Sequence, residues 1–349
     1  MKYRRSEVRS TVHALPQLRF EDQTLTSFAG LVIFQKFFAS IDLKSRLRRC
    51  FQTVARGKVF HPAAISRVLK HATAQSVEAL RRFLRERVLD GLRTFQSARV
   101  TLDFDGSVLS TQRRAEGTAV GFNKKKKGAR SYYPLFCTIA QTAQVLDFLF
   151  RPGNVHDSHG AEAFILACVE AVRAVLPNAL IEIRMDSAFF SDAIVGTLAR
   201  QGVEFTISVP FERFVELKKM IEQRRRWRRV DGETHYFETS WKPQCWDRRF
   251  RFVFLRTRAK KQQKGPIQLD LFEPYEYGYE FKVIVTNKTL RAKRVAAFHE
   301  GRGSQEGVFA ELKSHCLSPK ASLLRYIGEN NTPMVREFRG RLEIAGQSR

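Results

Sequence analysis

The chain has 349 residues, with 61 Lys and Arg against 35 Asp and Glu, which gives a formal net charge of +26. Solubility does not require an excess this large, so it indicates a polyanionic partner, and nucleic acid is the first expectation. The basic residues are spread along the chain rather than gathered beside a span or on one amphipathic helix, which argues against a membrane. Five isolated cysteines fit neither a zinc ribbon nor a disulfide framework, and no signal peptide is evident, so we expect a cytoplasmic protein.

Residues from about Leu25 to Arg99 show helical periodicity, within an N-terminal region that we delimit as 1–98. Apolar residues recur at helical spacing from Phe28 to Phe38 and again from Ser76 to Phe95, and Leu43–Arg49 between them is basic. We interpret this region as a helical N-terminal domain that binds DNA. The alternative is an ordinary bundle with a solvated basic face.

The pattern then changes to short apolar runs that alternate with helical segments. We expect strands at Arg99–Asp105, Tyr132–Ala140, Val145–Phe150, Leu180–Met185 and Val203–Val209, and helices at Ala161–Leu176 and Ser191–Arg200. This order predicts an α/β fold, in which a mixed sheet is flanked by helices.

Residues 211–286 differ in composition from the segments around them. They open with a basic run through Arg224–Arg229 and continue with strand candidates at Tyr236–Thr239, Phe250–Leu255 and Glu280–Thr286. We interpret them as a β-rich insertion into a core formed by residues 99–210 and 287–316. A last helix is expected from Arg291 to Ser314.

Two aspartates follow two of the predicted strands. Asp105 precedes Gly106 and Ser107, and Asp186 ends the run Ile181–Met185. Mg²⁺ prefers oxygen ligands and is held by one or two carboxylates together with substrate phosphates, so the pair suggests a metal site. Asp103 competes with Asp105 because strand alternation puts both on one face. For either aspartate alone, the simpler role is to start a turn or cap a helix.

The last predicted helix carries a third carboxylate among cations. His299, Arg302, Glu306 and Lys313 fall at positions i, i+3, i+7 and i+14, which share one stripe of an α-helix. Such a stripe fits a metal ligand beside residues that grip phosphates. Surface ion pairs such as Arg302–Glu306 explain the spacing equally well.

These residues resemble a known family. The spacing His299-x2-Arg302-x3-Glu306-x6-Lys313 is similar to the Tyr-x2-Arg-x3-Glu-x6-Lys signature of one group of DDE insertion-sequence transposases, with His in place of Tyr. Within that group the chain most resembles the insertion-sequence 1380 family. Supporting stretches are Gly121–Gly128, Ser131–Leu135 and Arg151–Asn154.

The resemblance implies an RNase H-like core, and catalysis by Asp105, Asp186 and Glu306 holding Mg²⁺ or Mn²⁺, as a pair of ions. It also implies that a homodimer acts on double-stranded DNA, at the terminal inverted repeats and at the target. Family members usually continue with helical, aromatic sequence, whereas 317–349 is polar and broken by Pro319 and Pro333. We therefore expect an atypical tail, truncated or frameshifted.

Further basic and aromatic residues are candidates for DNA contact. We expect phosphate contacts from Arg151 and from Lys124, Lys125, Lys126 and Lys127, which lie on a predicted turn near Asp105. Trp227, Trp241 and Trp246 either stack on bases or belong to the core of the insertion.

A short motif lies in the insertion. Its residues Gln268, Leu269, Asp270, Leu271 and Phe272 resemble the peptide by which bacterial replication proteins bind the sliding clamp. Burial of the three apolar residues within the insertion is an equal alternative.

The predicted function is metal-dependent cleavage of transposon-end DNA, followed by transfer of the freed 3′-hydroxyl strand into target DNA. The alternatives are a nuclease that cuts without joining and a non-catalytic DNA-binding remnant.

Overall fold

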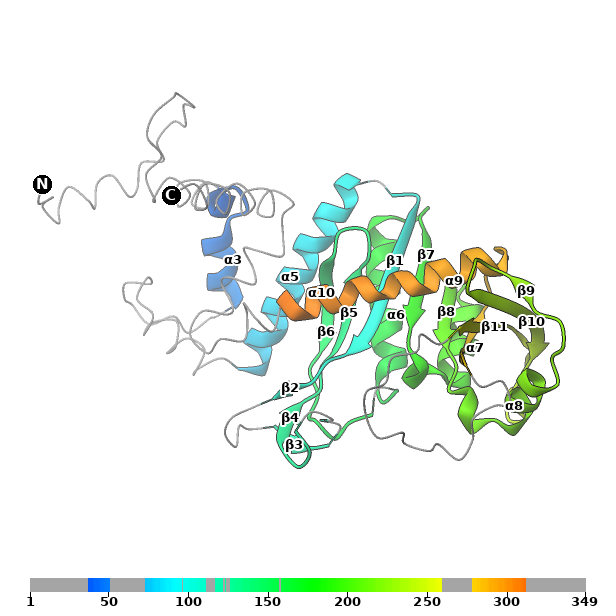
Figure 1. Cartoon of the computed structure of the whole chain (residues 1–349). Coiled ribbons are helices and arrows are strands. Elements are labelled where there is room, and N and C mark those ends of the chain that lie inside the picture. The colour runs from blue at the N-terminus through cyan, green and yellow to red at the C-terminus, as the bar shows by residue number, and fades with distance from the viewer. Residues whose placement is uncertain are drawn as a thin grey trace, which may run out of the picture. The chain divides into compact units, whose positions relative to one another are not determined.

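The computed structural model describes residues 37–50, 73–95, 97–110, 117–121, 123, 126–156, 158–258 and 278–311 (Figure 1). The chain divides into two compact units, Met1–Phe83 and Leu84–Arg349. The division falls inside helix α5 (Ala74–Phe95), so the second half of this helix belongs to the larger unit. We had expected one N-terminal region to extend to residue 98.

The first unit contains α3 (Leu43–Cys50), which matches the basic stretch expected between the two helical regions. Leu43 and Cys50 are buried, and the guanidinium of Arg46 lies 5.5 Å from the centroid of the Phe83 ring. The apolar set that starts at Phe28 falls mostly outside the described residues.

One nine-stranded mixed sheet forms the larger unit, in the order β6-β5-β1-β7-β8-β12-β11-β10-β9. Parallel pairing joins β1 to β7 and β7 to β8, and all other neighbours are antiparallel. The strands are β1 (Arg99–Gly106), β5 (Leu135–Ile139), β6 (Gln144–Leu149), β7 (Leu180–Met185), β8 (Glu204–Ser208), β9 (Arg228–Arg229), β10 (Thr234–Trp241), β11 (Phe250–Arg258) and β12 (Tyr279–Thr286).

A second, three-stranded sheet in the order β2-β4-β3 follows β1 along the chain (Figure 1). It contains β2 (Leu109–Ser110), β3 (Ala119–Val120) and β4 (Arg130–Tyr132). The strand that we expected over Tyr132–Ala140 is therefore split, with β4 ending before Pro134 and β5 starting after it. Proline lacks the backbone N–H that a central strand needs, which explains the break.

The helices are α6 (Ala161–Val175), α7 (Asp192–Arg200), α8 (Val215–Glu222), α9 (Ala292–Glu300) and α10 (Ser304–Glu311), with 3₁₀ turns at η1 (Ser187–Phe189), η2 (Phe211–Arg213) and η3 (Gly301–Gly303). The first two were expected from the sequence, whereas α8 lies in a segment for which we expected only strands. Ser191 caps α7 by accepting a hydrogen bond from the backbone N–H of Ile194 at 3.4 Å. The mixed α/β architecture expected from the sequence is confirmed.

The β-rich segment does not form a sheet of its own. Strand β12 pairs antiparallel with β8, and β11, β10 and β9 follow it outward in the same sheet. The segment therefore extends the core sheet through continuous backbone hydrogen bonds, rather than interrupting it as a separate layer.

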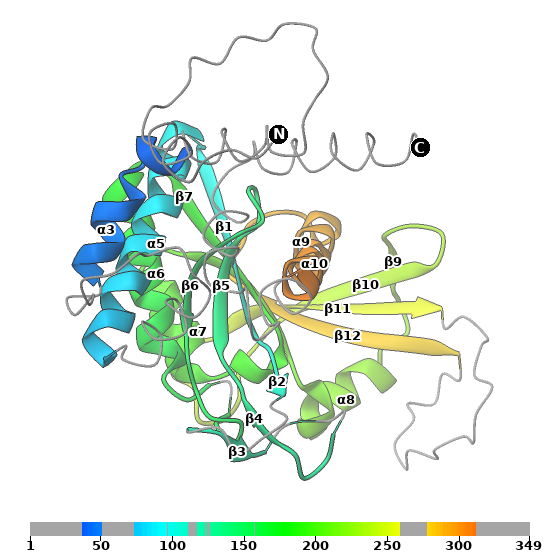
Figure 2. The same ribbon diagram turned by 90° about the vertical axis from the view of Figure 1, so that its left-hand side faces the viewer.

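The two faces of the central strands differ in chemistry. On one face, Val100, Leu102 and Phe104 of β1 pack with Ile183 of β7 and with the apolar side of α6 in the main core. The other face is polar, because the alternate positions of β1 are Thr101, Asp103 and Asp105. Figure 2 shows α6 and α7 on one side of the sheet, and α9 and α10 on the other.

Helices α9 and α10 cross this polar face and are anchored at its two ends. Ala292, Val295 and Ala296 of α9 pack on Val253, Leu255 and Ile284 of the outer strands. At the other end, Val308 and Phe309 of α10 pack on Phe136 and Val145, with the rings of Phe136 and Phe309 5.2 Å apart. The middle of the crossing thus lies above the polar residues of the central strands.

Candidate active site

Asp105 and Asp186 lie at one edge of the sheet. Phe104 of β1 pairs with Met185 of the parallel strand β7, and the two aspartates are the next residues along each strand. Because side chains alternate and Asp186 keeps an extended backbone, both project on the polar face. The carboxyl ends of two adjacent parallel strands thus present two carboxylates side by side.

Both aspartates contact other described residues. Asp186 caps η1, since its Oδ1 accepts a hydrogen bond from the N–H of Ala188 at 3.0 Å. Asp105 Oδ2 lies 3.5 Å from Arg302 Nη1, and the two side chains are about one-quarter exposed, at 24% and 28%. Asp186 therefore has the helix-capping role that we considered for it. The bond is made by Oδ1 and orients the carboxylate.

The last helix is not continuous. We expected one helix from Arg291 to Ser314, but η3 separates α9 from α10 at Gly301–Gly303. Glycine is a poor helix former, and two glycines flank Arg302, which explains the break. The signature residues that the structure describes, His299, Arg302 and Glu306, consequently do not share one helical stripe. His299, in the last turn of α9, is buried, whereas Glu306 is exposed in the first turn of α10.

His299 is part of the interior and not of a DNA-facing surface. It is 2% exposed, its Nδ1 lies 3.0 Å from Thr206 Oγ1, and its Nε2 lies 2.8 Å from Ser208 Oγ. Burial, together with the nearby charges of Lys282, Arg302 and Arg184, lowers the pKa of His299 to about 3. A neutral imidazole with both nitrogens engaged cannot serve the phosphate contact that we expected, so this assignment is corrected.

Asp103, the competitor of Asp105, is held by an ion pair. Arg184 is its register partner on β7 and donates from Nε to Asp103 Oδ1 at 2.6 Å and from Nη2 to Oδ2 at 2.7 Å. Burial raises the pKa of Asp103 above its ordinary value, although the hydrogen bonds and charge of Arg184 oppose that shift. With both oxygens bound by a buried guanidinium, Asp103 is a poor metal ligand, whereas the side chain of Asp105 is 24% exposed and more accessible to an ion.

The donor set suits a magnesium ion. Asp105 and Asp186 supply oxygen ligands only, both are partly exposed, and Mg²⁺ typically takes one or two protein carboxylates plus substrate phosphates. Within the described part of the chain, no group of three or more His, Cys, Asp or Glu side chains is arranged to hold a metal. Asp105 and Asp186 therefore follow paired residues of adjacent strands, and no such group joins Glu306 to them in the described part of the chain.

Arg151 also has an internal role. Its residue is 5% exposed, and its guanidinium donates to the backbone oxygens of Tyr133 at 3.2 Å, His156 at 3.2 Å and His159 at 3.1 Å. These bonds hold the segment after β6 against β4, where the N–H of Gly153 donates to the oxygen of Ser131 at 2.9 Å. The phosphate contact expected for Arg151 is corrected to this structural function.

Lys126 and Lys127 lie in an exposed turn of the small sheet. Asn123 shapes this turn, since its Oδ1 accepts from the N–H of Lys126 at 3.0 Å. The turn precedes β4, which pairs with β2, and β2 follows the end of β1 that carries Asp105 (Figure 1). Lys124, Lys125, Lys313 and the clamp-like motif Gln268–Phe272 lie outside the described residues.

The tryptophans of the extended sheet are mainly core residues. Trp241 and Trp246 are 8% and 4% exposed and pack among phenylalanines. The ring centroids of Trp246 and Phe190 lie 4.8 Å apart, and those of Trp241 and Phe252 lie 5.1 Å apart. Trp227 is partly exposed and lies under the guanidinium of Arg256 at 4.6 Å. The core interpretation therefore holds for Trp241 and Trp246.

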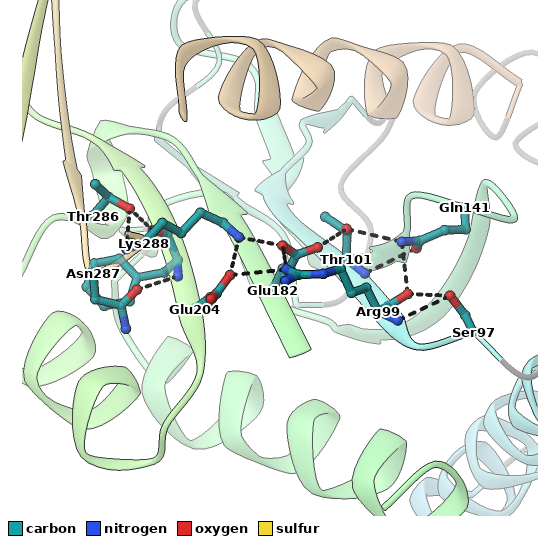
Figure 3. A network of polar contacts seen from close by, with 10 residues as sticks. Ser97, Arg99, Thr101, Gln141, Glu182, Glu204, Thr286, Asn287 and Lys288 are labelled. Atoms are coloured by element: carbon teal, nitrogen blue, oxygen red, sulfur yellow. Dashed lines mark hydrogen bonds and ion pairs between the residues drawn. The ribbon is translucent and has the colours of Figure 1, made fainter. Parts of the chain in front are cut away.

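A polar network that we did not expect lies on the same face at the other end of the parallel strands (Figure 3). The ammonium of Lys288, whose side chain is 0% exposed, contacts both Glu182 and Glu204. Arg99 donates to Glu182 at 2.7 Å. Although burial opposes it, the hydrogen bonds and charges of Lys288 and Arg99 lower the pKa of Glu182.

Sequence reasoning missed Arg184 and Lys288. For Arg184 a signal existed, because alternation within Leu180–Met185 puts Glu182, Arg184 and Asp186 on one face opposite the apolar Ile181, Ile183 and Met185. For Lys288 we find no such signal, since it follows the end of β12 and its partners come from β7 and β8.

Comparison with known proteins gives the class. The family model described as Transposase DDE domain group 1 matches residues 57–335. This match covers well over half of the chain, and the chain therefore belongs to this family of DDE transposases.

Solved structures show more distant similarities. The piggyBac transposase in a synaptic complex with hairpin DNA has 11% identity and a TM-score of 0.45, over 95% of this chain and 70% of that one. The Mos1 transposase in a paired-end complex with the left transposon end has 11% identity and a TM-score of 0.23, over 58% and 65% of the two chains. A search of curated proteins gives no match. No described helix is both long and apolar enough to cross a membrane.

Proposed function

We propose that this chain cuts the DNA at transposon ends and joins the freed 3′-hydroxyl strand to target DNA. The observation that carries the proposal is the placement of Asp105 and Asp186 on one face, at the carboxyl ends of the parallel pair β1 and β7. Membership of a DDE transposase family supports it. We assign strands β6-β5-β1-β7-β8 to the RNase H-like core, and we place the chain nearest to the insertion-sequence 1380 family.

Asp105, Asp186 and Glu306 are proposed to hold divalent cations, Mg²⁺ or Mn²⁺. When bound, a pair of such ions activates the attacking oxygen and stabilises the leaving oxygen at the scissile phosphate. The hydrogen bond from the N–H of Ala188 keeps the carboxylate of Asp186 directed towards the end of β1 that carries Asp105. Glu306 would join from the first turn of α10, where it is exposed.

Arg302 has a second function in this proposal. It lies 3.5 Å from Asp105, so its positive charge is next to the proposed metal position. Since a cation between the aspartates would repel it, we expect Arg302 to move from Asp105 to a phosphate of the bound DNA. Lys126 and Lys127 would contact further phosphates of the DNA backbone, together with Lys124, Lys125 and Lys313. A homodimer would bind the two transposon ends.

The test is an assay of cleavage and joining in one reaction. The full chain is incubated with Mg²⁺, a plasmid that carries its coding sequence with the flanking DNA, and a second plasmid as target. Excision with insertion into the target supports a transposase. Cleavage without joined product identifies a nuclease, and DNA binding without cleavage identifies a non-catalytic remnant. An Asp186→Asn chain that produces joined DNA like the wild type contradicts the proposed site.

No similarity above points to a sliding clamp as a partner. The motif Gln268–Phe272 remains a hypothesis from the sequence, which loss of clamp binding in a Leu271→Ala, Phe272→Ala chain would test.

A further inference from the structure

Arg184 joins three segments of the chain that are far apart in sequence. Its guanidinium donates twice to Asp103 on β1, and its Nη1 donates to the backbone oxygen of Phe298 on α9 at 2.9 Å. The Phe298 ring also lies 5.2 Å below the guanidinium carbon. Residues of the last helical turn have no intrahelical partner for their carbonyls, so this bond satisfies one of them.

Each joined segment carries one of the proposed metal ligands a few residues further on. Asp105 follows Asp103 by one strand repeat, and Asp186 follows Arg184 in the same way. Beyond Phe298 the chain turns through η3 into α10, which carries Glu306. A neighbouring bond reinforces the connection, because Gln305 Nε2 donates to the backbone oxygen of Asp103 at 3.1 Å.

The turn η3 rests directly on the Arg184 side chain. A Cβ atom placed on Gly301 would lie 2.2 Å from Arg184 Nη1, so only glycine fits while the guanidinium keeps its bonds. The backbone of Gly301 is itself ordinary right-handed helix (φ −57°, ψ −12°), which any residue adopts. The requirement for glycine is therefore one of space and not of conformation. At Gly303, in the same turn, an added Cβ would meet nothing within 4 Å.

We infer that Arg184 is a positioning residue for the metal site: it sets the distance of α10, and so of Glu306, from Asp105 and Asp186. The inference rests on the proposed function and adds a residue to it. Loss of a group that orients a metal ligand typically lowers metal affinity or activity by about 10- to 100-fold.

A purely structural ion pair would behave differently. Its disturbance would lower stability and leave the metal dependence of the folded protein unchanged. The variant that distinguishes the two is Gly301→Ala. Its added methyl group disturbs the packing of η3 against Arg184 without removing a charge or a hydrogen-bonding group. Gly303→Ala is the matched control, because it makes the same substitution in the same turn where space is open.

Two measurements on the full chain separate the alternatives. Binding of Mn²⁺ is followed by loss of the EPR signal of the free ion, which requires no catalysis. The Mg²⁺ concentration for half-maximal plasmid nicking is measured in parallel. For Gly301→Ala we expect Mn²⁺ affinity to fall and the Mg²⁺ requirement to rise by about tenfold, with Gly303→Ala like the wild type.

The effect should act through Glu306. Glu306→Gln alone should weaken Mn²⁺ binding, and adding Gly301→Ala to it should cause little further loss, since residues that act as a unit are not additive. Independent, multiplying losses would overturn the inference, as would a folded Gly301→Ala chain with wild-type metal dependence.

If thermal melting shows that Gly301→Ala does not fold, Arg184→Lys replaces it. Lysine keeps the charge beside Asp103 but cannot make the paired bonds together with the bond to Phe298. A folded Arg184→Lys chain with wild-type Mn²⁺ affinity would overturn the inference. Failure of the proposed function looks different, because Asp186→Asn would then bind Mn²⁺ and nick DNA like the wild type whatever happens at Gly301.

Discussion

Asp103 and Arg184 are register partners on parallel strands and form a two-bond ion pair beneath α9, one strand repeat before the proposed catalytic aspartates. Asp103→Asn leaves the buried guanidinium without its counter-charge, so the free energy of unfolding should fall by about 3–5 kcal/mol. Asp105→Asn should change it by no more than about 1 kcal/mol, because that pair is partly exposed. Urea denaturation of both variants measures this, and equal losses would contradict the assignment of the two aspartates.

Removal of a proposed metal ligand should stop cleavage without loss of DNA binding. Asp105→Asn, Asp186→Asn and Glu306→Gln should each lower Mg²⁺-dependent nicking on the order of a thousandfold, since metal ions stabilise the transition state by several kcal/mol. Asn at position 186 retains an oxygen that can cap Ala188, so folding should be preserved. Nicking rates and electrophoretic mobility shifts are compared with the wild type. Normal binding with normal nicking in any variant would remove that residue from the site.

Stability should depend on pH through His299. The unfolded residue takes up a proton below about pH 6.5, whereas the folded residue does so only near its pKa of about 3. The unfolded state therefore binds more protons in this window, and stability present above pH 6.5 is lost as the pH falls, by up to about 1.4 kcal/mol per pH unit. His299→Gln can keep bonds to Thr206 and Ser208 and should lack this slope between pH 6.5 and 5. Parallel pH profiles of unfolding for the two chains would refute the prediction.

Lys288 should stabilise the sheet at the end remote from the site. Lys288→Met leaves Glu182 and Glu204 without their buried counter-charge, and we expect a loss of about 3 kcal/mol, at the lower end for a broken buried pair. The value is low because Glu204 is 26% exposed and Arg99 still pairs with Glu182. Adding Glu182→Gln should recover part of the loss in denaturation experiments. A double variant less stable than Lys288→Met would show that the network does not work in this way.

Lys126 and Lys127 should contribute to DNA affinity through phosphates alone. Each lost phosphate contact lowers the slope of log affinity against log salt by about 0.9, so Lys126→Ala with Lys127→Ala should reduce it by up to about 1.8. The effect should be the same for DNA of any sequence. Lys218→Ala with Lys219→Ala, a charge-matched change on α8, serves as the comparison. An unchanged slope would move the phosphate contacts elsewhere.

Much of the secondary structure followed from local patterns. The strand Leu180–Met185 was predicted with its observed ends, and the helices α5, α6 and α7 were predicted to within two residues. Periodicity suffices there because each element buries one face against the same core, which fixes where apolar residues recur. The split at Pro134 and the break at Gly301–Gly303 were missed, although proline and glycine mark both places.

The chemistry of the candidate site can be predicted from local patterns: a strongly basic chain, an aspartate after each of two strands, and a glutamate among cations near the end of the predicted helices. Which of these groups come together depends on the fold. Parallel pairing of β1 with β7 places Asp105 beside Asp186. Asp103 is bound by Arg184 through two hydrogen bonds, so it is a poor metal ligand. His299 and Arg151 are buried, so they are poorly placed to contact DNA. Local patterns specify the face on which a side chain lies, but partners and burial arise from contacts between residues about eighty to two hundred positions apart, which no local period encodes.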